Sequence, residues 1–189
     1  MSVKRLLPLL VVLALVGVAC GGKDDPAISA GSAAGHNAAD VTFAKSMVPH
    51  HKQAVEMADM AIAKASDPKV KDLATRIKQA QGPEITTMKG WLADWGESAA
   101  GGHNSGDMEM GGSGMMSAQE MGDLEKSSGA GFDRMFLTMM IRHHEGAVEM
   151  ATTESKDGKF EPAKALAQQI SSAQKAEIAE MTALLETAK

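Results

Sequence analysis

The sequence predicts an all-α protein, a four-helix bundle made of two duplicated antiparallel helical hairpins joined by a long crossover loop. The segment Met47-Val48-Pro49-His50-His51 returns 93 positions later as Met140-Ile141-Arg142-His143-His144. The same offset continues without a gap over the flanking residues, pairing Asp40 with Asp133 and Met88 with Met181. Both copies carry apolar residues at helical spacing. An internal duplication of one helical unit accounts for all three observations.

The first residues predict an export signal. Lys4 and Arg5 precede an apolar stretch, residues 6–18, that is too short to span a bilayer. Cys20, the only cysteine, follows, and the segment resembles a bacterial lipoprotein signal, in which that cysteine is lipidated. Gly17 stands where such signals usually carry Leu, so cleavage without lipidation is the alternative. We expect a signal peptide over 1–19, a lipid anchor at Cys20 and attachment to the extracytoplasmic face of the cell membrane.

Charge and cysteine content limit the classes of function. The chain has a formal net charge of −5, and removal of Lys4 and Arg5 with the leader makes it −7. Without a basic cluster, nucleic-acid binding is not expected, and membrane attachment should depend on the acyl chain alone. A single cysteine allows no intramolecular disulfide, so the stability of an exported domain must come from its core.

The remaining chain divides into a tether and two hairpins. Residues 20–39 are small and polar, which predicts a flexible tether with a solvated His36. The first hairpin is expected over 40–95, with Asp40 as N-cap, and the second over 132–189. Between them, residues 96–131 are rich in Gly and Met and predict a loop with a short helix near 116–126. Gly82-Pro83 is expected to interrupt the second helix.

Helical periodicity turns both histidines of each repeat inward. At about 100° per residue, His50 and His51 fall within about 60° of Met47, whereas Glu56 falls on the opposite side. On the second helix, Glu84 lies in the middle of the apolar face with Leu73, Ile77, Ala80 and Met88, and Glu177 repeats this phase on the fourth helix with Ala173 and Met181. In an antiparallel hairpin these carboxylates come level with the histidines. Each half therefore predicts a core layer of two imidazoles, one carboxylate and several thioethers.

Burying imidazoles and a carboxylate among aliphatic groups costs on the order of several kcal/mol unless they are paired or bind an ion. One explanation is a Glu–His hydrogen bond in each half with partial exposure of the second histidine. The other is a metal, because neutral imidazole is a common ligand and carboxylates orient such rings. Thioethers bind Cu(I) and imidazole also serves Cu(II) and Zn, so we expect copper, with zinc as the alternative.

These motifs resemble the family known as domain of unknown function 305. Its hallmarks are a Met-x-x-His-His-x-x-Ala helix and a following Gln-x-x-Glu-Ile-x-x-Met helix. Both occur twice here, at Met47/His50/His51/Ala54, Met140/His143/His144/Ala147, Gln81/Glu84/Ile85/Met88 and Gln174/Glu177/Ile178/Met181. The resemblance implies a ferritin-like four-helix bundle, exported or lipid-anchored, with copper binding in some members. Pro83 departs from the pattern.

Three hypotheses follow for function. The first is a non-enzymatic copper-binding lipoprotein that buffers copper or hands it to an unidentified transfer partner at the cell surface. Its metal ligands would be His50, His51, His143 and His144 with the soft ligands Met47, Met57, Met140 and Met150, and Glu84 and Glu177 would orient or bind. The second is a carboxylate-bridged dimetal enzyme, which the lack of Glu-x-x-His disfavours. The third is a structural or partner-binding module with a non-metal His/Glu core.

Overall fold

The computed structural model describes residues 35–98 and 114–187, and these form five helices: α1 (Ala38–Lys64), α2 (Pro68–Asp94), α3 (Ala118–Lys126), α4 (Gly129–Asp157) and α5 (Glu161–Thr187). The prediction of an all-α fold is confirmed. None of the helices in these ranges combines the length and apolar character that crossing a membrane requires. The expected signal peptide, Cys20 and most of the tether lie outside the described residues, as do residues 99–113 of the Gly- and Met-rich loop.

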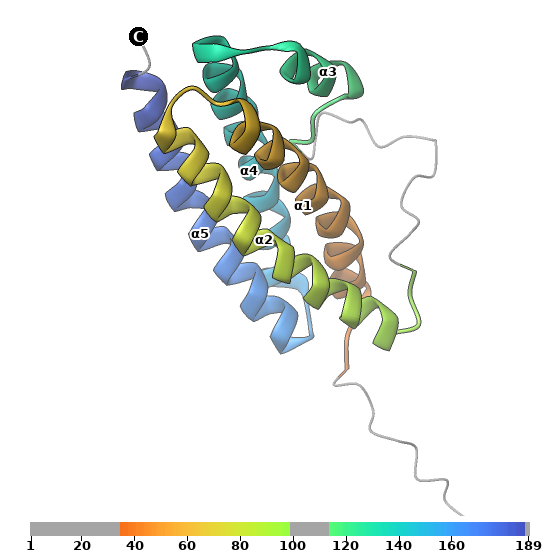
Figure 1. Ribbon diagram of the computed structural model, residues 1–189. Coiled ribbons are helices and arrows are strands. Elements are labelled where there is room, and N and C mark those ends of the chain that lie inside the picture. Colours follow the sequence, from red (N-terminus) through yellow and green to blue (C-terminus); the bar gives the residue numbers. More distant parts are fainter. Residues whose placement is uncertain (1–34, 99–113, 188–189) are drawn as a thin grey trace, which may run out of the picture. The chain divides into compact units, whose positions relative to one another are not determined.

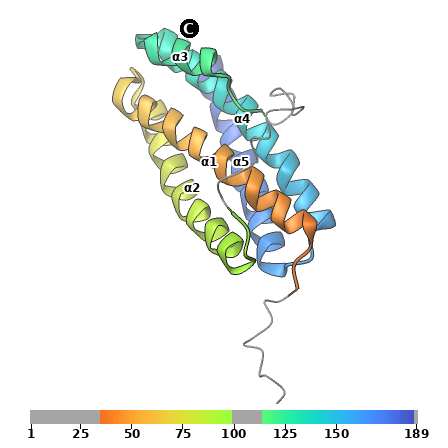
Figure 2. The same ribbon diagram turned by 90° about the vertical axis from the view of Figure 1, so that its right-hand side faces the viewer.

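The four long helices run side by side, with α1 and α2 forming one hairpin and α4 and α5 the other (Figures 1 and 2). Helix α1 also packs against α4, so the two halves meet mainly through their first helices. The short α3 precedes α4 and lies beside the turn between α1 and α2 in Figure 1. The second hairpin begins slightly earlier than predicted: α4 starts at Gly129 rather than near Phe132.

Two local expectations were wrong. The N-cap of α1 is Asn37, whose side chain accepts the backbone N–H groups of Ala39 and Asp40, while Asp40 accepts the N–H of Asn37 in return. This capping box satisfies donors that a helix start leaves open. Gly82-Pro83 does not interrupt α2, which is continuous from Pro68 to Asp94. Pro83 lies on the exposed side of the helix, where its missing hydrogen bond leaves a carbonyl near water.

Each half holds the turn of the other half with a buried aspartate. Asp40 of α1 accepts the N–H groups of Lys159 and Phe160, in the turn before α5, at 3.0 and 2.9 Å. Asp133 of α4 is its equivalent in the repeat and accepts the N–H groups of Ser66 and Asp67, in the turn before α2. Asp40 is fully buried and Asp133 is 4% exposed. These reciprocal bonds fasten the two hairpins together at both ends of α1 and α4.

The two ends of the bundle are filled differently. At the end where Asp40 lies, Trp91 and Trp95 each pack edge to face against Phe160, with ring centroids 5.5 and 5.4 Å apart. His36, expected to be solvated, stacks on Trp95 with the ring centroids 4.6 Å apart. A planar aromatic neighbour explains the difference, because an imidazole gains by stacking on an indole.

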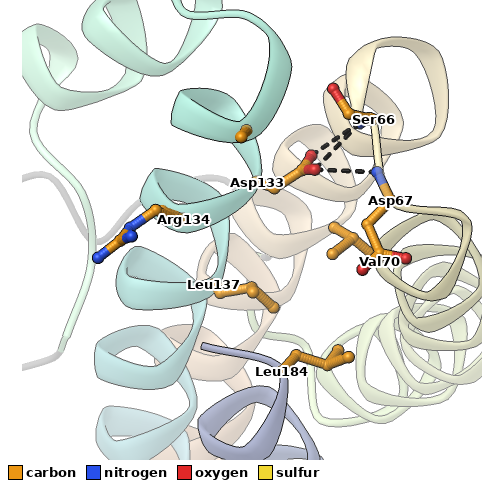
Figure 3. Close-up of a pocket in the computed structure, with 8 residues that line it drawn as sticks. Ser66, Asp67, Val70, Asp133, Arg134, Leu137 and Leu184 are labelled. Carbon is orange, nitrogen blue, oxygen red and sulfur yellow. Dashed lines mark hydrogen bonds between the residues drawn. The ribbon is translucent and has the colours of Figure 1, made fainter. Parts of the chain in front are cut away.

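The other end keeps a hollow of about 310 Å³ around Asp133 (Figure 3). Its lining residues come from the α1–α2 turn, α2, α4 and α5 and are Ser66, Asp67, Val70, Ala130, Asp133, Arg134, Leu137 and Leu184. In the repeat, Asp67 and Leu184 correspond to Phe160 and Trp91. Smaller or polar side chains thus leave open the space that aromatic rings fill at the opposite end.

Two apolar clusters form the core. One contains Met57, Phe132, Phe136, Met140 and Met181, and the other contains Phe43, Met47, Met88 and Ile170. The four histidines of the repeats belong to neither cluster. They lie about halfway along α1 and α4, as a polar layer between the two apolar clusters.

Candidate metal centre

The structure buries all four repeat histidines. His50 and His51 on α1, and His143 and His144 on α4, are each 0% exposed. Adjacent histidines on a helix diverge by about 100°, and within each pair the ring centroids lie 6.4 Å apart. One ring of each pair therefore faces the other hairpin, while the second ring faces its own.

The rings that face their own hairpin are bonded to a carboxylate. His51 Nε2 lies 2.8 Å from Glu84 Oε2 on α2, and His144 Nε2 lies 2.7 Å from Glu177 Oε2 on α5. The two glutamates reach the layer from partly solvated positions, with side chains 20% and 14% exposed. A carboxylate on one ring nitrogen fixes the orientation of the imidazole and raises the basicity of the other nitrogen.

The rings that face the other hairpin meet each other. His50 and His143 have centroids 3.7 Å apart with planes tilted by 32°, directly between α1 and α4. Burial, and then the charges that His50, His144 and His51 would carry, hold the pKa of His143 well below its usual value. His143 is therefore a neutral imidazole at neutral pH, which is the form that binds metal ions.

Hydrogen bonding leaves part of this layer unsatisfied. In the described ranges, Nδ1 of His51 and Nδ1 of His144 are buried without a hydrogen-bond partner. An unsatisfied buried polar atom costs about 1–3 kcal/mol. The explanation without a metal needed a Glu–His bond in each half and partial exposure of the second histidine. The bonds are present, but neither His50 nor His143 is exposed.

The predicted thioether ligands divide between the two sides of the layer. Met47 belongs to the apolar cluster on one side, while Met57 and Met140 belong to the cluster on the other, and all three are fully buried. Met150 is only partly buried, beside the cluster of Met47. Met47 and Met140 each precede the first histidine of their motif by three residues, so they lie one helical turn from the layer.

The layer is not a preformed site of hard ligands. No group of three or more His, Cys, Asp or Glu side chains has a metal-binding arrangement in the part of the chain that the structure describes. The donors nearest to such a group are two separate Glu–His pairs and the close, tilted pair of His50 and His143. A metal ion here would need thioether sulfur as well as nitrogen, or a rotation of these two rings.

Sequence periodicity missed two polar residues of the buried face. Gln81 and Gln174 are 2% and 3% exposed, one turn before Glu84 and Glu177 on their helices. Ala80 and Ala173, expected on that face, are exposed. Among the described residues, the side-chain oxygens of both glutamines find no hydrogen-bond partner. The signal was available, since both residues open the repeated Gln-x-x-Glu motif.

Fold and site together define an all-α protein built from a duplicated helical hairpin with a buried His/Glu layer at its centre. The family model described as Domain of unknown function (DUF305) matches residues 40–185. The chain belongs to this family, as its motifs predicted. No curated protein is significantly similar to the chain.

Solved structures of related proteins share the fold. A DUF305 protein from Streptomyces coelicolor, taken to be secreted, is 33% identical, with 79% of this chain and 92% of that one covered and a TM-score of 0.73. CopM in its Cu(II)-bound form is 33% identical, with 79% and 97% covered and a TM-score of 0.68. CopM in its Cu(I)-bound form is 31% identical, with 78% and 96% covered and a TM-score of 0.67.

Proposed function

We propose that the protein binds copper in the extracytoplasmic space and either buffers it or passes it to another protein. The observation that carries this proposal is the central layer of four fully buried histidines, two held by carboxylates through Nε2 with Nδ1 left over. A copper ion at this layer would use Nδ1 of His51 and Nδ1 of His144, which have no hydrogen-bond partner in the part of the chain that the structure describes. The similarity to CopM, which has been solved with Cu(I), Cu(II) and silver bound, supports the choice of metal.

Ligand chemistry assigns the roles. His50, His51, His143 and His144 would be the primary ligands, and Glu84 and Glu177 would fix the rings of His51 and His144. Met47, Met57, Met140 and Met150 would add soft sulfur donors, which favour Cu(I) over hard ions such as Mg²⁺. We expect zinc to compete weakly, because sulfur-rich donor sets with neutral thioethers suit Cu(I) better.

A copper titration of the metal-free protein, produced without a histidine tag, tests this proposal. The variant with alanine at all four layer histidines should lose most of the tight Cu(I) and Cu(II) binding that the wild type shows against competing chelators. The double variant His36→Ala/His103→Ala removes histidines outside the layer and is the matched control. Equal copper stoichiometry in wild type and in a folded four-histidine variant would refute the assignment.

We also propose that Cys20 carries a lipid anchor, so that copper is bound at the outer face of the membrane. The sequence of the leader supports this, as an apolar segment followed by the only cysteine. In cells fed an alkyne-labelled fatty acid, the wild type should be labelled and found with membranes. The Cys20→Ala variant should be unlabelled and soluble, and fatty-acid labelling that persists in this variant would contradict the anchor.

A further inference from the structure

A short segment, residues 114–117, crosses the outside of the α1–α4 contact before α3 begins. The Gln53 side chain on α1 forms two hydrogen bonds with the backbone of this segment. It donates to the Met116 carbonyl oxygen at 2.8 Å and accepts the Met116 N–H at 2.7 Å. On the α4 side, Arg142 contacts the Met116 sulfur and forms an ion pair with Glu120 of α3. Met116 itself is 3% exposed and packs into the apolar core. We call residues 114–117 the strap.

The strap lies directly on the backbone of α4. Gly114 has φ +72°, a conformation that favours glycine. A Cβ at this position would collide with the carbonyl oxygen of Arg142 and would lie 3.3 Å from Cα of Gly146. Both the sign of φ and the lack of space therefore require glycine. This close approach indicates a specific seat for the strap rather than a chance contact.

The seat is made where the two repeats differ. Gln53 of the first repeat corresponds to Gly146 of the second, and Pro49 corresponds to Arg142. Gln53 supplies the two hydrogen bonds to the strap, whereas Gly146 lies where Gly114 approaches the backbone of α4. The strap thus contacts positions at which the two repeats differ.

The contact site of the strap is also next to His50 and His143. Gln53 follows His50 by three residues, and Gly146 follows His143 by three residues, so each lies one helical turn away. His50 and His143 meet between the same two helices, with ring centroids 3.7 Å apart. The strap therefore crosses the α1–α4 seam within one turn of both rings.

We propose that the strap is a cover over the histidine layer and that Gln53 controls how fast metal enters and leaves through the α1–α4 seam. This inference rests on the proposed copper-binding function. Entry past Glu84 and Glu177 on α2 and α5, whose side chains are partly exposed, is the competing route. Only the route through the α1–α4 seam depends on the hydrogen bonds of Gln53, so substitution of Gln53 distinguishes the two routes.

Gln53→Ala tests the cover, with Gln79→Ala on the exposed face of α2 as the matched control. Loss of the two hydrogen bonds should increase, about tenfold or more, the fraction of molecules in which the strap has left the α1–α4 seam. In metal-free protein, diethyl pyrocarbonate should then modify His50 and His143 about tenfold faster in Gln53→Ala, as measured by peptide mass spectrometry. Gly114→Ala should have the same effect, because the added Cβ would collide with the Arg142 carbonyl oxygen and displace the strap from α4.

Stopped-flow transfer of Cu(I) from a coloured chelator completes the test. Uptake and release should both accelerate about tenfold in Gln53→Ala, with the dissociation constant unchanged within twofold. Wild-type rates of histidine modification and copper transfer in both strap variants would overturn the inference and favour entry past the glutamates. Faster modification in a protein that binds no copper in any form would support the cover but overturn the proposed function.

Discussion

Glu154 on α4 allows a quantitative test of how the buried carboxyl groups set stability. It is 1% exposed and lies beside Asp40, under the turn that Asp40 holds. Burial raises the pKa of Glu154 to about 8 from 4.5, and the negative charge of the neighbouring Asp40 acts in the same direction. The folded protein therefore keeps a proton that the unfolded chain releases above pH 4.5.

The sign and size of the effect follow from linkage. A carboxyl group with a raised pKa stabilises the fold below its unfolded value, and this contribution is lost as pH rises through the folded value. Between pH 5.5 and 7.5, almost one proton separates the two states, at about 1.36 kcal/mol per pH unit. Wild type should thus lose about 2.5 kcal/mol of unfolding free energy relative to Glu154→Gln, which keeps the shape but cannot ionise.

Urea denaturation followed by circular dichroism at pH 5.5 and 7.5 measures this difference. Each other titrating group is common to both proteins and cancels in the comparison. Glu56→Gln, at an exposed position on α1, is the control and should give the same difference from wild type at both pH values. If the difference in unfolding free energy between wild type and Glu154→Gln is the same at pH 5.5 and at pH 7.5, this result refutes the argument. The pKa of Glu154 would then not be raised in the folded protein.

Three further predictions follow. Asp133→Asn should lower the unfolding free energy by about 1–3 kcal/mol, because two backbone N–H groups lose a charged acceptor, whereas the exposed Asp123→Asn should change it little in urea denaturation. The double variant Glu84→Gln/Glu177→Gln should bind copper about 10–100-fold more weakly in chelator competition. The control variant Glu56→Gln should bind copper as the wild type does. His143 should show the nitrogen chemical shifts of a neutral ring at pH 6, since burial and the neighbouring imidazoles lower its pKa; a titration midpoint near 6.5 would contradict this.

Periodicity and repetition predicted the parts of the site that lie on one helix or within one hairpin. The inward direction of His50 and His51 follows from 3.6 residues per turn. The short antiparallel turn between α1 and α2 predicted that Glu84 comes level with the histidines of its hairpin, and the structure shows that it bonds His51. Repetition gave the same expectation for Glu177, which bonds His144.

Contacts between the hairpins could not be predicted in this way. The bond from Asp40 to the Lys159 turn joins segments whose relative position depends on how the two halves pack. The exposed Ala80 shows a second limit, because alanine fits both sides of a helix and does not fix its orientation. Residues 114–117 have no period, so their seat on Gln53 depends on tertiary contacts alone.

X-ray absorption at the copper edge of the Cu(I)-loaded wild type tests the central claim most directly, which is that the buried histidine layer binds the metal. The spectrum should show imidazole scattering together with sulfur, and the imidazole signal should disappear in a folded variant with alanine at His50, His51, His143 and His144. A wild-type spectrum without imidazole, or one that these four substitutions leave unchanged, would contradict the claim.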